Sequence, residues 1–362
     1  MLKYLDEYRD STLCLEIAEK IRSMSTRPLN IMEVCGGHTM SIRKHGIHKL
    51  LGDNVKLISG PGCPVCVTSI RDINKAIALA SVENAVICTY GDMIYVPGTS
   101  SSLAKTKADG KDIRTVYSVH DVINFAKEEK DKNFIFISIG FETTAPTAAA
   151  AIKEAAKAKL NNFFILSLNK TMPDALRAVL ADEGSIIDSL LCPGHVSTIT
   201  GTGIYEFIVN ELGVSCCVSG FEPADILKAI YLLTEIHEKD KKALLNAYTR
   251  VVKVGGNEKA QKILDEVFEP ADVDWRGIGV ISGSGLALRE TFSKFDAEKV
   301  FDVTVEDSSE IPGCICGDIL RGAKRPVDCT LFKKTCTPID PKGACMVSSE
   351  GTCAAWFKYG EE

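Results

Sequence analysis

Three short motifs early in the chain carry thiol, imidazole and carboxylate groups, and each follows a short apolar run. They are Cys-Gly-Gly-His with Cys35 and His38, Cys-Pro-Val-Cys with Cys63 and Cys66, and Tyr-Gly-Asp with Asp92. In an open α/β sheet, the loops beyond the carboxyl ends of the strands line one crevice. We therefore expect these side chains to converge, and their types favour soft-metal binding and thiol redox chemistry.

The Cys63-x-x-Cys66 pair stands immediately before a predicted helix. The partial positive charge at a helix N-terminus lowers the pKa of nearby thiols and favours the thiolate. This placement predicts a dithiol that exchanges with disulfides or binds a metal. Half of a structural zinc site is the alternative, in which Cys35 and His38 would supply the two missing ligands.

Six of the 14 cysteines lie close together near the C-terminus, on a segment rich in Pro and Gly with little apolar periodicity. Such a segment has too few core residues to fold stably without a cross-link, and in a reducing compartment we expect a metal cluster to provide it. The thiols whose wide spacing suits a 4Fe-4S cluster are Cys329, Cys336, Cys345 and Cys353. Zinc is the alternative, but zinc sites usually pair thiols about two to four residues apart. Only Cys314 and Cys316 are that close, and we interpret them as a redox pair or as spare ligands.

Other polar residues and cysteines give weaker signals. Glu142 follows a predicted strand and could act as an acid at a helix N-terminus. His195 lies in Cys-Pro-Gly-His, where a histidine satisfied by its own loop is the more ordinary interpretation. The remaining cysteines, interpreted as small buried hydrophobes, are Cys14, Cys88, Cys192, Cys216 and Cys217.

Composition excludes several classes of function. The chain has 362 residues, of which 45% are hydrophobic and 25% charged, and this is enough for two or three domains. A net charge of -6 and a pI near 5.7 give no attraction to phosphate backbones, so we expect no nucleic-acid partner. We find no signal peptide pattern and no stretch apolar enough for a membrane span, and therefore expect a cytoplasmic protein without membrane contact.

Short apolar strands alternate with amphipathic helices through most of the chain, which predicts parallel sheets flanked by helices. The pattern over residues 58–77, from strand through glycine to helix, is echoed over 218–230. We therefore predict an α/β fold with two related parallel-sheet α/β domains and a small cysteine-rich iron-sulfur domain. The predicted domains are 1–127 with the Cys35 and Cys63/Cys66 loops, 128–245, and 246–362. The predicted strands are 29–34, 55–59, 85–89, 134–139, 163–168, 186–191 and 300–305.

Six motifs together resemble those of the HypD family of nickel-iron hydrogenase maturation factors, in the same order, from about residue 30 to 359. They are Cys-Gly-Gly-His-Thr, Gly-Pro-Gly-Cys-Pro-Val-Cys, Tyr-Gly-Asp-Met, Phe-Glu-Thr-Thr-Ala-Pro, Cys-Pro-Gly-His and Cys-Met-Val-Ser-Ser-Glu-Gly-Thr-Cys. One position departs from the family, because Met40 stands where a second histidine is usual. Methionine exchanges no proton at neutral pH, so we expect His38 alone to suffice, with help from His45 or His48.

The resemblance implies a scaffold on which one iron acquires two cyanides and one carbon monoxide before delivery to a hydrogenase large subunit. It implies a HypC-type small chaperone and a HypE-type cyanide donor as partners, with a 4Fe-4S cluster on the four late cysteines. Cys35 would be the chief iron ligand, with Cys63 and Cys66 as further ligands or as a dithiol. His38 and Asp92 would support the ligands or handle protons. Glu142 would line the same crevice.

An iron-sulfur thiol-disulfide reductase is the competing function. It would use the same cluster and the Cys63/Cys66 dithiol, with a protein disulfide as its substrate. Cys35 discriminates between the two, because a reductase needs neither a third thiol nor an iron. A maturation scaffold would assemble a metal centre with redox steps rather than act as a conventional turnover enzyme.

Overall fold

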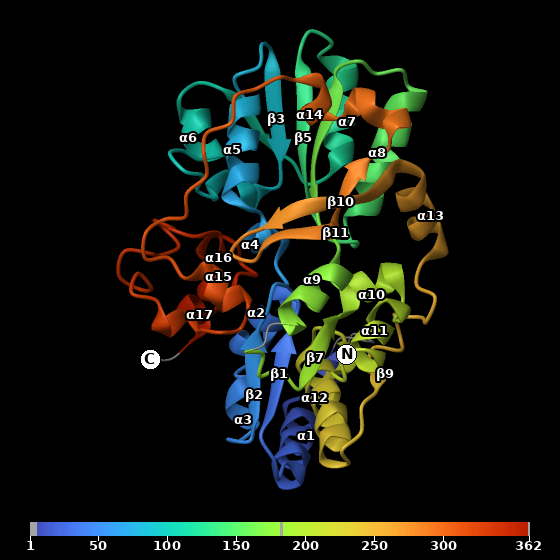
Figure 1. Ribbon diagram of the computed structural model, residues 1–362, viewed down its shortest axis with the longest axis vertical. Coiled ribbons are helices and arrows are strands. Elements are labelled where there is room, and N and C mark those ends of the chain that lie inside the picture. Colours follow the sequence, from blue (N-terminus) through green and yellow to red (C-terminus); the bar gives the residue numbers. More distant parts are fainter. Residues whose placement is uncertain (1–5, 182–183, 361–362) are drawn as a thin grey trace.

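Two parallel β-sheets organise the protein, which is described by a computed structural model over residues 6–181 and 184–360 (Figure 1). The five-stranded sheet has the order β2-β1-β7-β8-β9, with β1 (Leu29–Glu33), β2 (Val55–Ser59), β7 (Ser189–Pro193), β8 (Ser215–Ser219) and β9 (Leu244–Asn246). The four-stranded sheet has the order β4-β3-β5-β6, with β3 (Ala85–Thr89), β4 (Asp112–Thr115), β5 (Asn133–Gly140) and β6 (Phe163–Asn169). All strand pairs in both sheets are parallel, which confirms the predicted α/β class.

Each sheet draws strands from both of the first two predicted domains. β1 and β2 share a sheet with β7, β8 and β9, whereas β3 and β4 pair with β5 and β6. The boundary predicted at residue 127, between the ranges 1–127 and 128–245, therefore falls within one sheet, between β4 and β5. The echoed segments correspond to β2 and β8, which belong to the same sheet. Alternation of strands and helices does not encode pairing, because every parallel crossover has the same local pattern.

Helices flank both sheets and enclose three apolar cores. The five-stranded sheet packs against α1 (Ser11–Met24), α2 (Gly36–Lys44) and α12 (Pro223–Glu238). The four-stranded sheet is covered by α5 (Ile70–Leu79) on one face and by α7 (Val119–Glu128), α8 (Ala145–Lys157) and α13 (Glu258–Val267) on the other. Further short helices are α3 (Ile47–Leu50), α4 (Pro64–Val67), α6 (Leu103–Ala108), α9 (Met172–Leu180), α10 (Gly194–Thr200), α11 (Glu206–Asn210) and α14 (Ala297–Val300). Among the described residues no helix is both long and apolar enough to cross a membrane.

The chain beyond β9 packs on both sheets. β10 (Phe268–Trp275) and β11 (Gly279–Leu288) form an antiparallel hairpin that crosses between the two sheets in Figure 1. The strand predicted at 300–305 is not formed, since residues 301–310 are neither helix nor strand. Phe301 instead packs edge-on against Phe164, with 4.7 Å between ring centroids, so the apolar residues there cover a core without joining a ladder. The cysteine-rich end carries α15 (Cys316–Leu320), α16 (Ala344–Val347) and α17 (Thr352–Tyr359).

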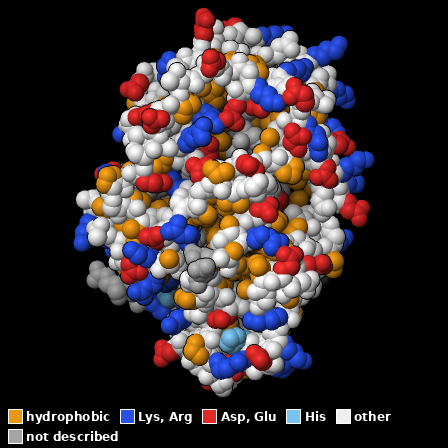
Figure 2. Space-filling model, in the orientation of Figure 1, with side chains coloured by type: hydrophobic (Ala, Val, Ile, Leu, Met, Phe, Trp, Pro, Cys, Tyr) orange, Lys and Arg blue, Asp and Glu red, His pale blue; other side chains and the backbone are white. Residues whose placement is uncertain are grey.

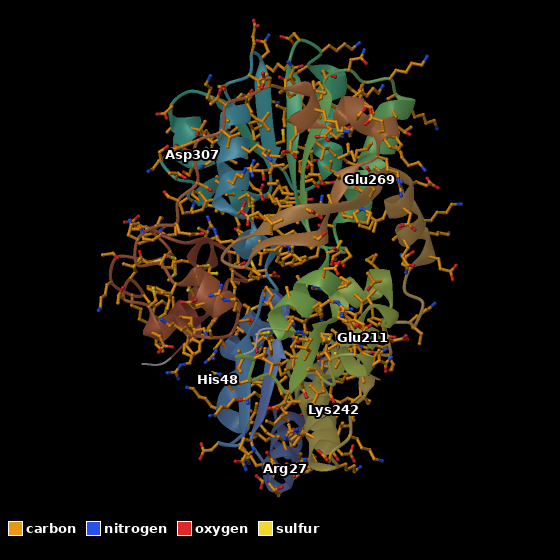
Figure 3. The ribbon with its side chains drawn as sticks, in the orientation of Figure 1. Arg27, His48, Glu211, Lys242, Glu269 and Asp307 are labelled. Atoms are coloured by element: carbon orange, nitrogen blue, oxygen red, sulfur yellow. The ribbon has the colours of Figure 1, made fainter. Side chains whose placement is uncertain are left out.

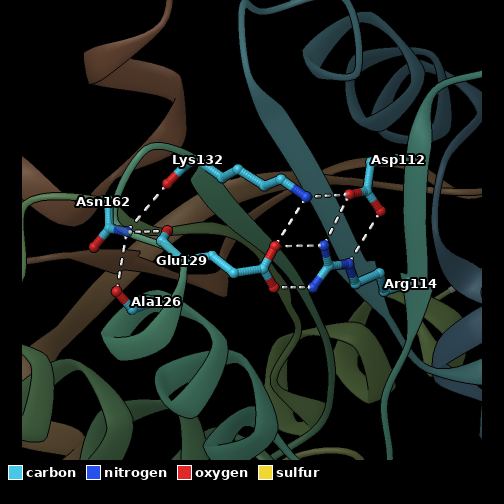
Figure 4. Close-up of polar contacts among 6 residues, drawn as sticks. All are labelled: Asp112, Arg114, Ala126, Glu129, Lys132 and Asn162. Atoms are coloured by element: carbon cyan, nitrogen blue, oxygen red, sulfur yellow. Dashed lines mark hydrogen bonds and ion pairs between the residues drawn. The ribbon is translucent and has the colours of Figure 1, made fainter.

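A polar network closes the β4 edge of the four-stranded sheet (Figure 4). Arg114 on β4 donates to Asp112 at 2.9 Å and to Glu129 at 2.6 Å, and Lys132 joins Glu129 at 2.8 Å. The side-chain amide of Asn162 donates to three backbone carbonyls around the end of α7. Charged side chains on an edge strand disfavour pairing with another chain, so this network both anchors α7 and protects the edge.

Candidate functional site

The Cys35 and Cys63 motifs form two loops that are joined to each other by backbone hydrogen bonds. Cys35 follows β1 and is the N-cap of α2, where it is 8% exposed. The Gly36 amide donates to the Gly62 carbonyl at 3.0 Å, and the Gly60 amide donates to the Glu33 carbonyl at 2.9 Å. Because β1 and β2 are neighbours in register, the turns that follow them lie side by side.

Gly62 permits the close approach of these loops. A Cβ atom at this position would lie 2.1 Å from the Cys35 amide nitrogen, a backbone atom that cannot move aside. We expect Gly62→Ala to separate the loops and destabilise the protein by about 3 kcal/mol. Gly91→Ala is the matched control, since a Cβ there meets nothing within 4 Å. Thermal unfolding of the two variants checks this, and equal melting temperatures would contradict it.

A cavity of about 250 Å³ opens above Cys35, where loops from both sheets face each other. Cys35 follows β1, Asp92 follows β3, and His195 follows β7, so three strand ends contribute polar groups. Glu350 closes the cavity from the cysteine-rich end of the chain. The other walls are mainly apolar and include Val34, Val65, Met93, Ile139, Phe141 and Val196. The structure thus brings Cys35 and Asp92 together at the strand ends, as the motif positions predict.

Burial raises the pKa of two groups that line the cavity, the Cys35 thiol and the Glu350 carboxyl. Burial, followed by the nearby Glu350 and Cys63, raises the pKa of the Cys35 thiol to about 12. Burial and the neighbouring Asp92 also raise the pKa of Glu350. A thiol in this setting becomes a thiolate only when a cation replaces its proton, so metal binding at Cys35 would release a proton into the cavity.

His38 does not line this cavity. Its ring is fully buried, Nε2 lies 2.9 Å from the Gly220 carbonyl oxygen, and the ring stacks on Phe221 at 4.8 Å. Burial lowers its pKa to about 4, so the imidazole is neutral at pH 7. His195 stacks on Phe221 as well, at 3.9 Å, and this second histidine does reach the cavity. The arrangement gives His38 a role in fixing α2 to the loop after β8, and makes His195 the histidine that faces the cavity.

Glu142 lies behind the cavity wall rather than in it. Its neighbours Phe141 and Thr143 line the cavity, whereas its own Oε1 accepts the Met172 amide at 2.9 Å. Oε2 is buried without a hydrogen-bond partner among the described residues, and the side chain is 6% exposed. Burial raises the pKa of Glu142 to about 7.

This shift makes stability depend on pH. The folded protein binds a proton at Glu142 up to about pH 7, whereas an unfolded chain releases it near 4.5. The stabilisation by the proton is complete below 4.5 and is lost as the pH rises through 7. Between pH 4.5 and 8 we expect the free energy of unfolding to fall by about 3 kcal/mol relative to Glu142→Gln. Denaturant unfolding across this range tests it, with the exposed Glu83→Gln as control; a difference independent of pH would contradict it.

Cys63 and Cys66 begin the short helix α4, with Pro64 at its first position. The Cys66 amide donates to Cys63 Sγ at 3.3 Å, so the first thiol caps the helix. Cys66 is 1% exposed and turns away from the cavity toward the cysteine-rich segment. Burial, then the Cys345 and Cys63 thiols, raise the pKa of Cys66 well above its usual value.

Cys345 lies between Cys66 and Cys316. Its sulfur is 2.8 Å from Cys316 Sγ, and Cys66 also hydrogen-bonds to it, which lowers the pKa of Cys345. The backbone around Cys316 is fixed by a close contact, because a Cβ at Gly317 would lie 2.7 Å from the Gly277 Cα in the β10–β11 turn. These contacts form a continuous row of thiols from α4 into the cysteine-rich segment.

The row ends at a small buried cavity of about 20 Å³ that is lined by six thiols and by apolar side chains. Cys353 lies close enough to the other thiols that, after burial itself, they raise its pKa; these are Cys345, Cys336, Cys314 and Cys329. All of these cysteines are free, and an all-thiol donor set in an apolar shell fits an iron-sulfur cluster. In the part of the chain that the structure describes, no three His, Cys, Asp or Glu side chains converge on a single metal-ion position. A 4Fe-4S cluster distributes its four thiolates over separate irons.

Comparisons with known proteins agree with the motifs. Residues 12–360 match the HypD family, described as the hydrogenase formation hypA family. The chain belongs to the HypD family. A putative hydrogenase expression/formation protein of Methanocaldococcus jannaschii is 44% identical over 353 residues, which cover 97% of this chain and 98% of the relative. The hydrogenase maturation factor HypD of Rhizobium leguminosarum bv. viciae is 44% identical over 369 residues, which cover 99% of this chain and 96% of the relative. The hydrogenase maturation factor HypD of Escherichia coli is 39% identical over 369 residues, which cover 100% of this chain and 99% of the relative.

As a member of the HypD family this chain is a hydrogenase maturation factor. Its structure adds Glu350 to the residues that the sequence singled out, and it gives contacts to His195 and Cys316, whose signals in the sequence were weaker. Glu350 and His195 face Cys35 across the cavity, and Cys316 contacts Cys345. Glu350 lies between Cys345 and Cys353 in one of the motifs shared with the HypD family, and this position was its only signal in the sequence.

Proposed function

We propose that this protein holds one iron atom at Cys35 while two cyanides and one carbon monoxide are attached to it. The observation that carries the proposal is the row of thiols that starts beside Cys35 and ends at the six-cysteine cavity. A soft thiolate complements low-spin ferrous iron with strong-field ligands. The apolar walls around Cys35 exclude water from this iron.

The contacts within the thiol row support different roles for different cysteines, some as a dithiol and others as cluster ligands. Cys345 contacts Cys66 and Cys316, so we assign it to a dithiol with Cys316 rather than to a metal site. The 4Fe-4S ligands we propose are Cys314, Cys329, Cys336 and Cys353, in which Cys314 replaces the Cys345 expected from spacing. Such a cluster supplies or accepts single electrons when it is bound.

The proposed chemistry requires electrons. Release of cyanide from a cysteine thiocyanate breaks the sulfur–carbon bond and consumes two electrons, giving cyanide and a thiolate. Closure of the Cys63/Cys66 dithiol to a disulfide supplies two electrons and releases two protons. Asp92 and Glu350, which lie across the cavity from Cys35, are placed to accept protons released there.

We propose the HypC-type chaperone and the HypE-type cyanide donor as partners, with delivery to a hydrogenase large subunit in the cytoplasm. An iron-sulfur thiol-disulfide reductase would use the same thiol row, from the cluster to Cys63 and Cys66. The separate cavity at Cys35 is walled by apolar residues from both sheets. It favours the iron scaffold, because reduction of a protein disulfide would not require this cavity.

Infrared spectroscopy on protein purified anaerobically with its small chaperone tests this function. We expect cyanide and carbonyl stretching bands, together with iron beyond the amount that matches the cluster sulfide. A cluster-containing preparation without these bands, but active on protein disulfides, would favour the reductase.

A further inference from the structure

A second cavity, of about 360 Å³, lies beside β2 at the other end of α2 from Cys35. We call it the basic cavity. It is bounded by β2, by the last turn of α2, and by the cysteine-rich end of the chain through α15, α17 and the residues between them. Cations outnumber anions around it four to one; the charged lining residues are Arg43, Lys56, Lys324, Arg325 and Asp328.

Arg43 is the most buried of these cations. Its side chain is 9% exposed, and its guanidinium carbon lies 3.6 Å from the centroid of the Trp356 ring on α17. Among the described residues, Nε of Arg43 is buried without a hydrogen-bond partner. A buried donor without a partner costs free energy, and a bound acceptor would remove this cost.

The nearby carboxylates leave the basic cavity positively charged. Lys324 pairs with Asp318 at 3.9 Å and Arg325 with Asp328 at 3.6 Å, and both cations are exposed. Lys56 has no ion pair among the described residues. Among the described residues, the buried carboxylate near Arg43 is that of Glu33, whose Oε1 accepts the hydroxyl of Ser59 at 2.8 Å.

The surplus of positive charge around the basic cavity affects the pKa of Arg43. Burial lowers its pKa, Glu33 opposes the shift, and Arg325 adds to it. Glu33 is fully buried, and its own pKa is raised by that burial, so it compensates Arg43 only in part. Figure 2 shows Lys and Arg side chains gathered over this part of the face, around α17 and the nearby end of β2.

We propose that the basic cavity binds a small organic anion, with phosphate or carboxylate oxygens between the four cations and an apolar part against Ile58, Ile319 and Trp356. Its volume lies within the range of small-molecule sites, which are mostly apolar with a few polar groups that fix orientation. The planar guanidinium group of Arg43 already lies against an aromatic ring, so it loses little conformational entropy when it binds an oxyanion.

An anion in the basic cavity would link the helix that begins at Cys35 to the helix that contains Cys353. Arg43 belongs to the helix that begins at Cys35, and Trp356 belongs to the helix that contains Cys353. A ligand held by Arg43, Lys324 and Arg325 would therefore fix the cysteine-rich segment against the five-stranded sheet. Binding would be favoured in the folded protein and would raise its melting temperature.

Calorimetric titration of the anaerobically purified full chain at constant ionic strength tests the proposal with phenyl phosphate, phthalate and inorganic phosphate. Phenyl phosphate or phthalate should bind about tenfold more tightly than inorganic phosphate, because the ring adds apolar contact. Lys56→Gln should weaken binding about tenfold. Lys242→Gln, the same change beside the opposite edge strand of the sheet, should not alter it (Figure 3).

Arg43→Gln should weaken binding more than Lys56→Gln, and Arg325→Gln serves in its place if the buried variant fails to fold. Heats no larger than those from chloride, or equal losses in Lys56→Gln and Lys242→Gln, would overturn the proposal. Cys35→Ala should bind phenyl phosphate as the parent does, so failure of the anion site and failure of the proposed iron function are distinguishable.

Discussion

Cys35→Ala should abolish the cyanide and carbonyl infrared bands while leaving the iron-sulfur content unchanged. Of the described cysteines, Cys35 alone lines the cavity between the sheets, and the cysteine-rich cavity lies at the far end of the thiol row. Loss of a residue that merely supports a metal ligand costs up to about 100-fold in affinity or activity, so loss of the ligand itself should lower hydrogenase maturation by at least that factor.

Cys14→Ala is the matched control for this experiment. Cys14 is also a buried free thiol, but it lies on α1 under the five-stranded sheet, away from the cavity. This variant should keep both the infrared bands and hydrogenase maturation, with no more than the loss of stability expected for a small buried side chain. Bands that persist in Cys35→Ala would remove the basis of the iron scaffold.

Cys314→Ser should lose the cluster, whereas Cys345→Ser should retain it. We expect Cys345→Ser to keep about four irons and four sulfides per chain, because Cys345 pairs with Cys316 and Cys66. Cys314→Ser should lose most of both, since it removes a proposed ligand. Iron and sulfide analysis with the visible absorption of the cluster measures this directly.

The electron path gives a second readout for the same pair. Cys345→Ser interrupts the contact between Cys316 and Cys66. An excess of a chemical reductant, which would supply two electrons one at a time through the proposed cluster, should then no longer open the Cys63/Cys66 disulfide. Thiol alkylation followed by mass spectrometry reports this step. Cys88→Ser, in a separate core of the four-stranded sheet, is the control. Cluster loss in Cys345→Ser with retention in Cys314→Ser would restore the ligand set read from spacing alone.

Local sequence determined several of the strands and the motifs at their ends. The predicted strands at 55–59 and 85–89 agree with β2 and β3, because short β-branched runs bounded by glycine are a local property of the chain. The rule that loops follow the carboxyl ends of parallel strands placed Cys35 at the end of β1 and Asp92 at the end of β3. These strands belong to different sheets, so the cavity that the two residues share depends on how the sheets face each other.

Only the tertiary structure decided which strands share a sheet and which side chains meet. Pairing of β1 with β7, the choice of His195 over His38 at the cavity, and the contact between Cys316 and Cys345 all join residues far apart in the chain. The same holds for Arg43 and Trp356, whose stacking shapes the basic cavity. Side-chain direction and long-range contact depend on how helices pack over a sheet, and residue spacing along the chain carries no record of that packing.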